Sequence, residues 1–486
     1  MEKADITLRI EKWAKEVDQM KGVSPELEAI GKFVVGAKWK DLPEPVVHET
    51  KRLLLDSIGC GFTGISVDPG KMIIALARRL GGPPEASIIG VGGKVSVSTA
   101  VLANGQLINA TDFDAFAGGG HGPAFLIPGP LAMAESIGAS GKDLILATAL
   151  AVEIADRVKR AVTVLTEDPT FRIREREGYA HANFGAAAGV GKLLNLGQEK
   201  MMNALGIAGH ACEVITWTHV SLQDRGHPQK YGIPGWQGTG AIMSVLLADM
   251  GYVGDLDVFN PKHGFWKFVG YGGWKPEIIT DDLGKAWKFT AGSVTYKPYI
   301  CCRIYQAAMD VFYEIIEKNN LMAEDIKSVK IIRQIGPDWT GLFRNTEIGN
   351  IVDAQFSIPY NISCAAHRVK IGVEWQDIDT MRDPKILEFM KKVTVTGPES
   401  STSMVGMQRV EVEAKGKTFA EERTVARGGT ISSTGNVQLT DEELEMKFRH
   451  NAVRILSEGQ INRAVEILWD LEKLENVQEL MDQITL

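Results

Sequence analysis

The chain has 486 residues and a mass of 53.1 kDa, which predicts two or three domains rather than one core. Apolar residues make up 44% and charged residues 23%, a composition that excludes a disordered chain, a collagen-like repeat and a membrane protein. The 53 basic and 61 acidic residues leave a net charge of −8, and no run rich in Lys or Arg offers a basic face to nucleic acid.

The first part of the chain has the pattern of a helical domain. An amphipathic N-terminal helix would include Leu8, Trp13 and Val17, and no apolar run resembles a secretion signal or a membrane span. Further helical segments are predicted over 46–62, 86–110 (with loops), 144–157 (capped from Ser140), 184–194, 201–210 and 238–250. The last three are rich in small residues, which let helix axes approach closely. We therefore expect a tightly packed helical domain over residues 1–274.

The pattern changes to that of a mixed domain after residue 273. Strand-like segments are predicted at 329–332, 393–395, 409–413 and 418–425, with helices at 305–318 and 384–392. A hairpin turn is predicted at Lys415-Gly416. Residues 275–429 would form an α+β lid, and residues 430–486 would return to the helical domain from a cap at Thr440. The predicted fold class is therefore mainly α with an α+β part.

The cysteines and the missing cofactor motifs restrict the chemistry. Five scattered cysteines imply no disulfide framework and favour reduced thiols in the cytoplasm. The sequence has no G-x-x-x-x-G-K-[ST] phosphate loop, no G-x-G-x-x-G dinucleotide motif and no zinc-type spacing of Cys and His. We predict chemistry on side chains alone, without a metal, flavin or nicotinamide.

Four short stretches gather residues suited to proton transfer and anion binding. The first, residues 109–123, holds two aspartates, three glycines and His121. Its simplest interpretation is a surface loop with helix-capping aspartates. Its functional interpretation is that the glycines bring backbone amides near an anionic substrate while His121 transfers a proton. The other stretches are residues 225–235, 296–303 and 355–360.

Together the four stretches resemble the MmgE/PrpD family, whose members include 2-methylcitrate dehydratase, cis-aconitate decarboxylase and iminodisuccinate epimerase. The family's order and spacing are also matched at 56–61, 153–157, 184–188, 246–251 and 447–448, so the resemblance covers nearly the whole chain. It implies a large helical domain built from both chain ends, an α+β lid and a homodimer formed through the helical domain.

The resemblance also implies roles for individual residues. Asp112 matches the first Asp of the family's D-F-D-D-T motif and His121 the His after it; Lys297 matches the Lys of K-P-Y-x-x-C. The expected catalytic residues are His121, Lys230, Lys297 and Tyr360, and the expected substrate-binding residues are Asp112, His227, Arg303 and His181. We expect the catalytic four to converge on a pocket between the helical domain and the lid.

Several positions depart from the family pattern. The D-F-D-D-T motif ends in Ala115-Phe116, and Asn109 and Gln306 stand where the family has histidines. The family's second catalytic His falls near Arg176, with His181 as a candidate substitute five residues later. These losses argue against a standard 2-methylcitrate dehydratase or cis-aconitate decarboxylase.

The resemblance therefore implies a cofactor-independent lyase of the dehydratase type that removes a proton next to a carboxylate of a small di- or tricarboxylate. Two alternatives stay open. One is an epimerase or isomerase of an amino- or imino-polycarboxylate. The other is a paralogue that binds a polycarboxylate without turning it over. No nucleic-acid or membrane partner is expected.

Overall fold

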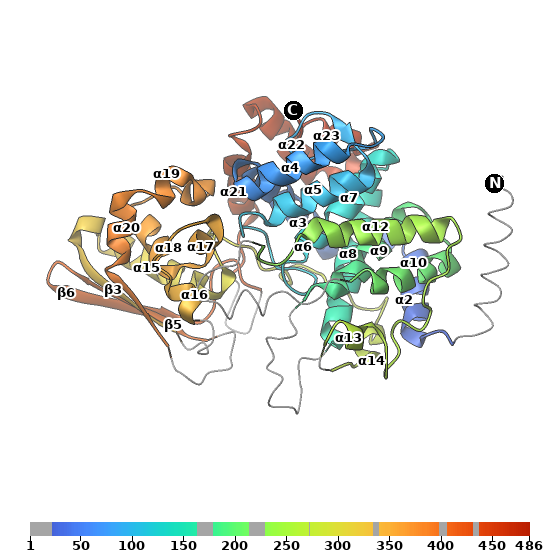
Figure 1. Ribbon diagram of the computed structural model, residues 1–486, viewed down its shortest axis with the longest axis horizontal. Coiled ribbons are helices and arrows are strands. Elements are labelled where there is room, and N and C mark those ends of the chain that lie inside the picture. Colours follow the sequence, from blue (N-terminus) through green and yellow to red (C-terminus); the bar gives the residue numbers. More distant parts are fainter. Residues whose placement is uncertain are drawn as a thin grey trace.

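The computed structural model describes residues 22–162, 178–212, 229–271, 273–333, 340–397, 406–430 and 437–486 (Figure 1). The predicted helix around Trp13 and the candidate residue His227 lie outside these ranges. Helices dominate the described chain, with one four-stranded sheet and one two-stranded pair, so the predicted fold class is confirmed. None of the described helices has the length and apolar character needed to cross a membrane.

The first part of the chain is helical, as predicted. Its longer helices are α2 (Pro25–Gly36), α3 (Glu44–Ser66), α4 (Asp68–Leu80), α5 (Val97–Asn109), α7 (Pro128–Ser136), α8 (Gly141–Ala161), α9 (Ala180–Leu193), α10 (Gln198–His210) and α12 (Pro234–Asp249). Shorter ones are α6 (Pro123–Leu126), α13 (Phe265–Phe268) and α14 (Glu277–Thr280). Ser140 and Asp143 form the predicted capping box of α8. An antiparallel pair that the helical pattern did not predict, β1 (Ala86–Ser87) and β2 (Lys94–Val95), precedes α5.

Helix α9 lies at the centre of this part and packs against α8, α10 and α12. Its glycines allow the close approach: a Cβ at Gly185 would lie 2.2 Å from the carbonyl oxygen of Ala151, and one at Gly189 would lie 2.6 Å from that of Ala147. Nearly every residue of α9 is buried. The small-residue faces expected from the sequence therefore pack against neighbouring helices inside the helical part.

The C-terminal segment packs back on the first helices, beside α3 (Figure 1). It contains α21 (Asp441–Ala452), α22 (Glu458–Trp469) and α23 (Gln478–Met481), and Thr440 and Glu443 form the capping box of α21. Phe448 packs directly on Gly59 of α3, where a Cβ would lie 3.3 Å from the Phe448 backbone. The two chain ends thus share one hydrophobic core.

The α+β part is built on a sheet of order β4-β3-β5-β6. The strands are β3 (Ile326–Arg333), β4 (Val393–Thr396), β5 (Gln408–Ala414) and β6 (Lys417–Arg423), close to the predicted segments. Strand β4 runs parallel to β3, whereas β5 is antiparallel to both β3 and β6. The helices are α15 (Gln306–Lys318), α16 (Thr340–Arg344), α17 (Ile351–Phe356), α18 (Ile358–Ala366), α19 (Ile378–Met381) and α20 (Pro384–Met390), and the single turn η6 spans Val373–Gln376.

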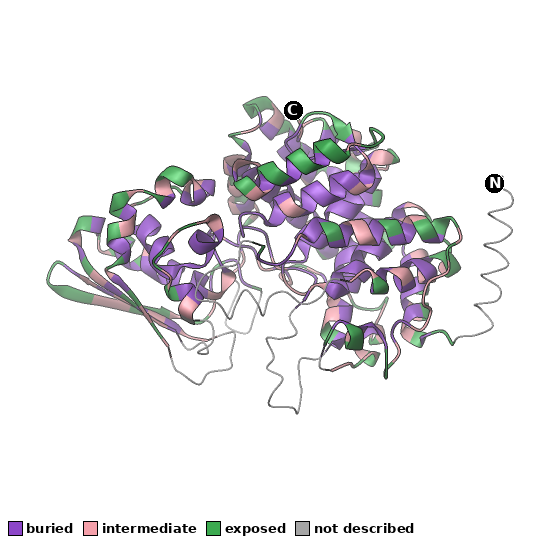
Figure 2. Ribbon diagram, viewed as in Figure 1, coloured by how far each residue is buried: buried purple, intermediate pink, exposed green. Residues whose placement is uncertain are grey.

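The helices of this part lie over one face of the sheet (Figure 1). Val329 and Ile331 of β3 and Val410 and Val412 of β5 are buried on that side, whereas edge strand β6 is largely exposed (Figure 2). This second core also takes in Cys60, Phe113 and Tyr231 from the helical part. The loops that carry Asp112 and Lys230 are therefore positioned where the two parts meet.

Candidate active site

The loop after α5 carries two of the predicted residues, Asp112 and His121. Asp112 has a φ of 58°, a left-handed conformation that is uncommon for residues other than glycine and concentrates at functional sites. Gly118, Gly119 and Gly120 also have positive φ, and the Ala117 amide donates to the Gly120 carbonyl (2.9 Å). This tight turn returns the chain so that His121 lies beside Ala117.

The glycines of this turn pack against protein side chains. A Cβ at Gly119 would lie 2.5 Å from the Lys159 side chain and 2.8 Å from His181 Nε2, and one at Gly120 would lie 3.0 Å from Tyr179. Their small size is explained by the turn and by these contacts. The interpretation that they bring backbone amides near a substrate stays a prediction.

Asp112 is the centre of a buried charge cluster. Its Oδ1 accepts hydrogen bonds from Lys230 Nζ (3.0 Å) and the Tyr231 hydroxyl (3.3 Å), and its Oδ2 accepts one from Lys297 Nζ (2.7 Å). Both Asp112 and Lys297 are fully buried. Burial raises the pKa of Asp112, but Lys230 and Lys297 outweigh it and hold the pKa below its usual value. Asp112 is therefore a carboxylate at neutral pH.

The two lysines differ in their protonation equilibria. Burial lowers the pKa of Lys230, and its partner Asp112 only partly compensates. Burial also opposes the charge of Lys297, but Asp112 and Asp114 outweigh it and raise its pKa. Lys297 is thus the fixed cation, whereas Lys230 is the lysine that can more readily give up a proton. Lys230 also has a left-handed backbone, with a φ of 51°.

His121 is held by the second aspartate of the loop. Its Nδ1 lies 3.0 Å from Asp114 Oδ2, and Asn109 Nδ2 donates to the same carboxylate (3.2 Å). An ionised carboxylate only accepts, so Nδ1 carries the proton and Nε2 keeps its lone pair. Nε2 lies 3.7 Å from Asp112 Oδ1, too far for a hydrogen bond. In this tautomer the basic nitrogen lies on the side of Asp112 Oδ1, the oxygen that accepts from Lys230.

The surroundings of His121 favour a neutral imidazole. Burial lowers its pKa, and Lys297 adds to that effect while Asp114 opposes it; the net shift is downward. The ring packs between Phe116, whose centroid is 4.3 Å away, and Tyr231, at 4.6 Å. A neutral, oriented histidine beside two lysines is a suitable general base.

The α+β part contributes Gln355 rather than Tyr360 to the cluster. Gln355 Oε1 accepts from Lys230 Nζ (3.2 Å), and its Nε2 donates to the Ala110 carbonyl (2.9 Å). Tyr360 is buried in the second core, and its hydroxyl donates to the Trp375 carbonyl (2.5 Å). The expected convergence of all four catalytic candidates therefore fails for Tyr360, because α18 directs its ring into the core of the α+β part.

Two further candidates lie beside the cluster rather than in it. His181 has Nε2 2.9 Å from the Gly118 carbonyl and Nδ1 3.4 Å from the Tyr271 hydroxyl, so it supports the turn that carries His121. Arg303 is half-buried and donates to the Arg427 carbonyl (3.2 Å) and weakly to Gln306 (3.5 Å). Gln306 occupies the family's histidine position and donates to the Tyr299 and Cys301 carbonyls, a structural role.

A buried ion pair between α3 and α21 lies next to the cluster. Lys447 of α21 donates to Asp56 Oδ1 (2.7 Å), to the Phe113 carbonyl (2.8 Å) and to the carbonyl of Lys297 (3.2 Å). It therefore joins the Asp112 loop to the Lys297 loop. Asp56 and Lys447 lie in the family-like motifs at 56–61 and 447–448, but the sequence did not predict that these two distant motifs would be in contact.

Lys447→Met is expected to lower the free energy of unfolding by about 3–5 kcal/mol, because it leaves the buried Asp56 carboxylate without its cationic partner. Urea denaturation followed by circular dichroism measures this change. In the double variant Asp56→Asn/Lys447→Met no buried charge is left unpaired, so most of the stability should return. A single variant as stable as the unmodified protein would contradict the assignment.

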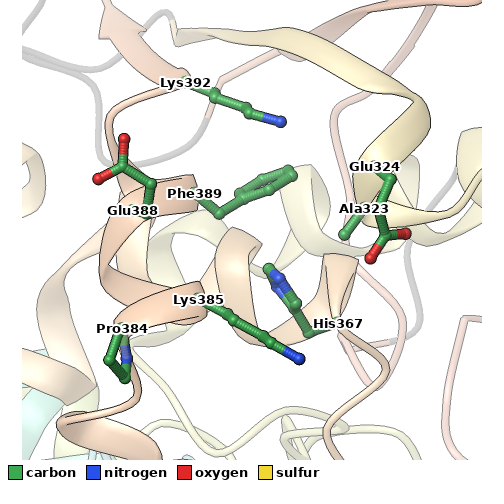
Figure 3. A pocket seen from close by; sticks show the side chains of 8 residues that line it. All are labelled: Ala323, Glu324, His367, Pro384, Lys385, Glu388, Phe389 and Lys392. Atoms are coloured by element: carbon green, nitrogen blue, oxygen red, sulfur yellow. The ribbon is translucent and has the colours of Figure 1, made fainter.

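A depression on the outer side of the α+β part is separate from this cluster (Figure 3). It has a volume of about 460 Å³ and lies between Ala323-Glu324 and helix α20. Its Lys392 donates to the Ile326 carbonyl (2.7 Å), and His367 Nδ1 to the Ser363 carbonyl (2.9 Å). These polar groups serve the local fold. Elsewhere in the described ranges, no group of three or more His, Cys, Asp or Glu is placed to hold a metal ion.

Comparison with known proteins agrees with the resemblance found in the sequence. Models of the MmgE/PrpD N-terminal and C-terminal domains match residues 28–277 and 299–473. Human cis-aconitate decarboxylase is 22% identical over 481 residues, covering 93% of each chain. The cis-aconitate decarboxylase of Aspergillus terreus is 22% identical over 91% of this chain and 92% of its own. The cis-aconitate decarboxylase-like protein oryM of Aspergillus oryzae is 28% identical over 93% of this chain and 96% of its own.

Proposed function

The chain belongs to the MmgE/PrpD family, and we propose that it is a cofactor-independent lyase acting on a small di- or tricarboxylate. The observation that carries the proposal is the geometry of His121: Asp114 fixes its Nδ1 proton, and its Nε2 lies 3.7 Å from Asp112 Oδ1, the oxygen that accepts from Lys230. Relatives named cis-aconitate decarboxylase, matched over nearly their whole length, support a carboxylate substrate.

The proposed reaction begins with proton transfer at a carbon next to a carboxylate. Such a proton is weakly acidic, so the negative charge that develops on the carboxylate must be stabilised by fixed donors. His121 Nε2 accepts the proton, and Asp114 stabilises the imidazolium that forms. Lys297 supplies a permanent positive charge, while Lys230, with its lowered pKa, donates a proton to the leaving group or to the new carbon centre.

The preference for a lyase over an epimerase rests on the relatives. An epimerase needs acid–base groups on both faces of the reacting carbon, and His121 with Lys230 would supply such a pair, whereas the ring nitrogens of His181 face the Gly118 carbonyl and the Tyr271 hydroxyl. We propose the lyase because the matched relatives are named cis-aconitate decarboxylase.

A panel of substrates followed by proton NMR tests the proposal. The purified protein is incubated with citrate, 2-methylcitrate, cis-aconitate, malate and iminodisuccinate, with a heat-inactivated sample as control. A new vinyl signal or release of carbon dioxide supports the lyase. Inversion of configuration without loss of atoms identifies an epimerase, and binding without any product identifies the non-catalytic alternative.

The pH dependence of kcat/KM should report His121. The base must be neutral, and burial lowers its pKa below the ordinary 6.5. We therefore expect activity to be constant near pH 7 and to fall with decreasing pH only below pH 6.5. A pH titration of kcat/KM measures this limb. An acidic limb centred above pH 7 would contradict a depressed histidine as the base.

We also propose a cytoplasmic homodimer formed through the helical domain. Trp236, Met243, Leu247 and Met250 lie at helical spacing along α12 and its C-cap and are exposed. Burying this stripe against a second copy would remove apolar surface from water. Light scattering at micromolar concentration should give twice the chain mass of 53.1 kDa, and Met243→Glu/Leu247→Glu should give a monomer. A monomer before substitution would contradict the dimer.

A further inference from the structure

The charges of the cluster leave little to bind a polyanion. Asp112 and Asp114 are carboxylates, Lys230 and Lys297 are their cations, and His121 is neutral, so the formal charges sum to zero. A di- or tricarboxylate carries at least two negative charges at neutral pH. Binding it in a buried site requires a cation that the protein does not already neutralise.

Arg333, at the end of β3, is a cation of this kind. Its side chain is on the inward face of the sheet, in the same row as Val329 and Ile331, and only 5% of the residue is exposed. The Nε and Nη2 atoms are buried and have no hydrogen-bond partner. Among the residues that the structure describes, no carboxylate is within ion-pair distance of this guanidinium.

The surroundings of Arg333 compensate little for its burial. The guanidinium lies over the Phe343 ring, 4.7 Å from its centroid, a contact much weaker than a paired carboxylate. Burial lowers the pKa of Arg333 to about 10, which still leaves it charged at neutral pH. A buried cation with unused donors destabilises the protein that carries it, which points to an anionic ligand as the missing partner.

Short contacts connect Arg333 to the cluster. Phe343 packs edge-on against Tyr305, with centroids 5.8 Å apart, and the Tyr305 hydroxyl donates to the Gln355 carbonyl (2.7 Å). The Gln355 side chain accepts from Lys230. Arg333 is therefore connected to Lys230 through three successive residues of the α+β part, Phe343, Tyr305 and Gln355.

We propose that Arg333 binds a carboxylate of the substrate remote from the reacting carbon, through two parallel hydrogen bonds from its unpaired Nε and Nη2. This proposal rests on the proposed function for the identity of the ligand. Arg333 would thereby select substrates with more than one carboxylate, because a guanidinium recognises a carboxylate in a bidentate geometry. Nothing in the sequence singled it out, since it ends a strand otherwise patterned as core.

The test measures ligand binding and stability apart from turnover. Isothermal titration of the full-length protein with citrate and with propionate is repeated for Arg333→Met, Arg333→Lys and, as the matched control, Arg344→Met. Arg344 is a nearby but exposed arginine. We expect Arg333→Met to weaken citrate binding by about 10- to 100-fold, with propionate binding unchanged. Arg333→Lys should lie between, and Arg344→Met should bind citrate normally.

The stability of the ligand-free variants gives an independent readout. Because Arg333 has unused donors, Arg333→Met should melt at the same temperature as the unmodified protein or higher, while the stabilisation by citrate is lost. A variant that fails to fold or melts much lower would overturn the proposal, since it would show that the guanidinium is a structural group. Undiminished citrate binding by Arg333→Met would also overturn it.

Two further arms separate this inference from the proposed function. Titration with inorganic phosphate tests for a general anion site: an Arg333-dependent phosphate affinity with unchanged citrate binding would overturn substrate recognition. Citrate binding that depends on Arg333, without product from any substrate, would refute the lyase and leave the anion site standing. Turnover with a KM that Arg333→Met leaves unchanged would refute the Arg333 site and leave the lyase standing.

Discussion

His121→Ala is expected to lower kcat by about 10²–10⁴-fold, the usual effect of removing one general acid–base group. Its imidazole is the group whose tautomer is fixed by Asp114 and whose pKa is depressed by burial. His121 does not bind the carboxylates of the substrate in this proposal, so its loss should change KM little. Steady-state kinetics on the substrate identified by NMR measures both constants.

His367→Ala is the matched control for this variant. His367 is a half-buried histidine of the α+β part whose Nδ1 donates to a backbone carbonyl, in the depression of Figure 3. It should leave kcat unchanged, which separates loss of the base from a general effect of removing an imidazole. Normal turnover by His121→Ala would show that another group transfers the proton.

Lys297→Met should reduce kcat/KM by about 10²–10³-fold, because it removes a preorganised cation from the site where negative charge develops. It should also change the pH profile in a predictable direction. Lys297 lowers the pKa of His121, so its removal raises that pKa and moves the acidic limb of kcat/KM to higher pH. The pH titration of the variant measures this shift.

The control here is Lys192→Met. Lys192 of α9 donates to the Val35 carbonyl (2.8 Å) and is remote from the cluster. Its loss should leave both kcat/KM and the pH profile unaltered. An acidic limb that stays in place in Lys297→Met would contradict an electrostatic contact between Lys297 and His121.

The main elements could be predicted from sequence because their signals are local. Ser140 and Thr440 each begin a helix with a capping box, and the β5–β6 hairpin turns at Lys415-Gly416, where both residues have positive φ. The family motifs also predicted that His121, Lys230, Lys297 and Tyr360 would meet; the first three lie around Asp112, whereas Tyr360 does not. Their catalytic roles stay predictions.

The rest depends on contacts between distant segments. Lys447 lies 334 residues from Phe113, whose carbonyl it binds, and no local pattern encodes that pairing. Tyr360 was expected in the cluster from its motif, but the orientation of α18 buries it elsewhere and Gln355 from the same stretch makes the contact instead. The sequence analysis did not predict that Tyr231 would contact Asp112. Its position next to Lys230 was the one signal that could have indicated it.

The most direct test of the central claim is deuterium incorporation. The protein and His121→Ala are incubated in deuterium oxide with the substrate panel, and NMR follows exchange at carbons next to carboxylates. The lyase account predicts, with the unmodified protein, deuterium at such a carbon after decarboxylation or reversal of proton removal, or loss of the hydrogen at that carbon with a new vinyl signal after elimination, and at least about 10²-fold less of either with His121→Ala. Neither change at any such carbon across the panel, or equal rates with both proteins, would contradict the account.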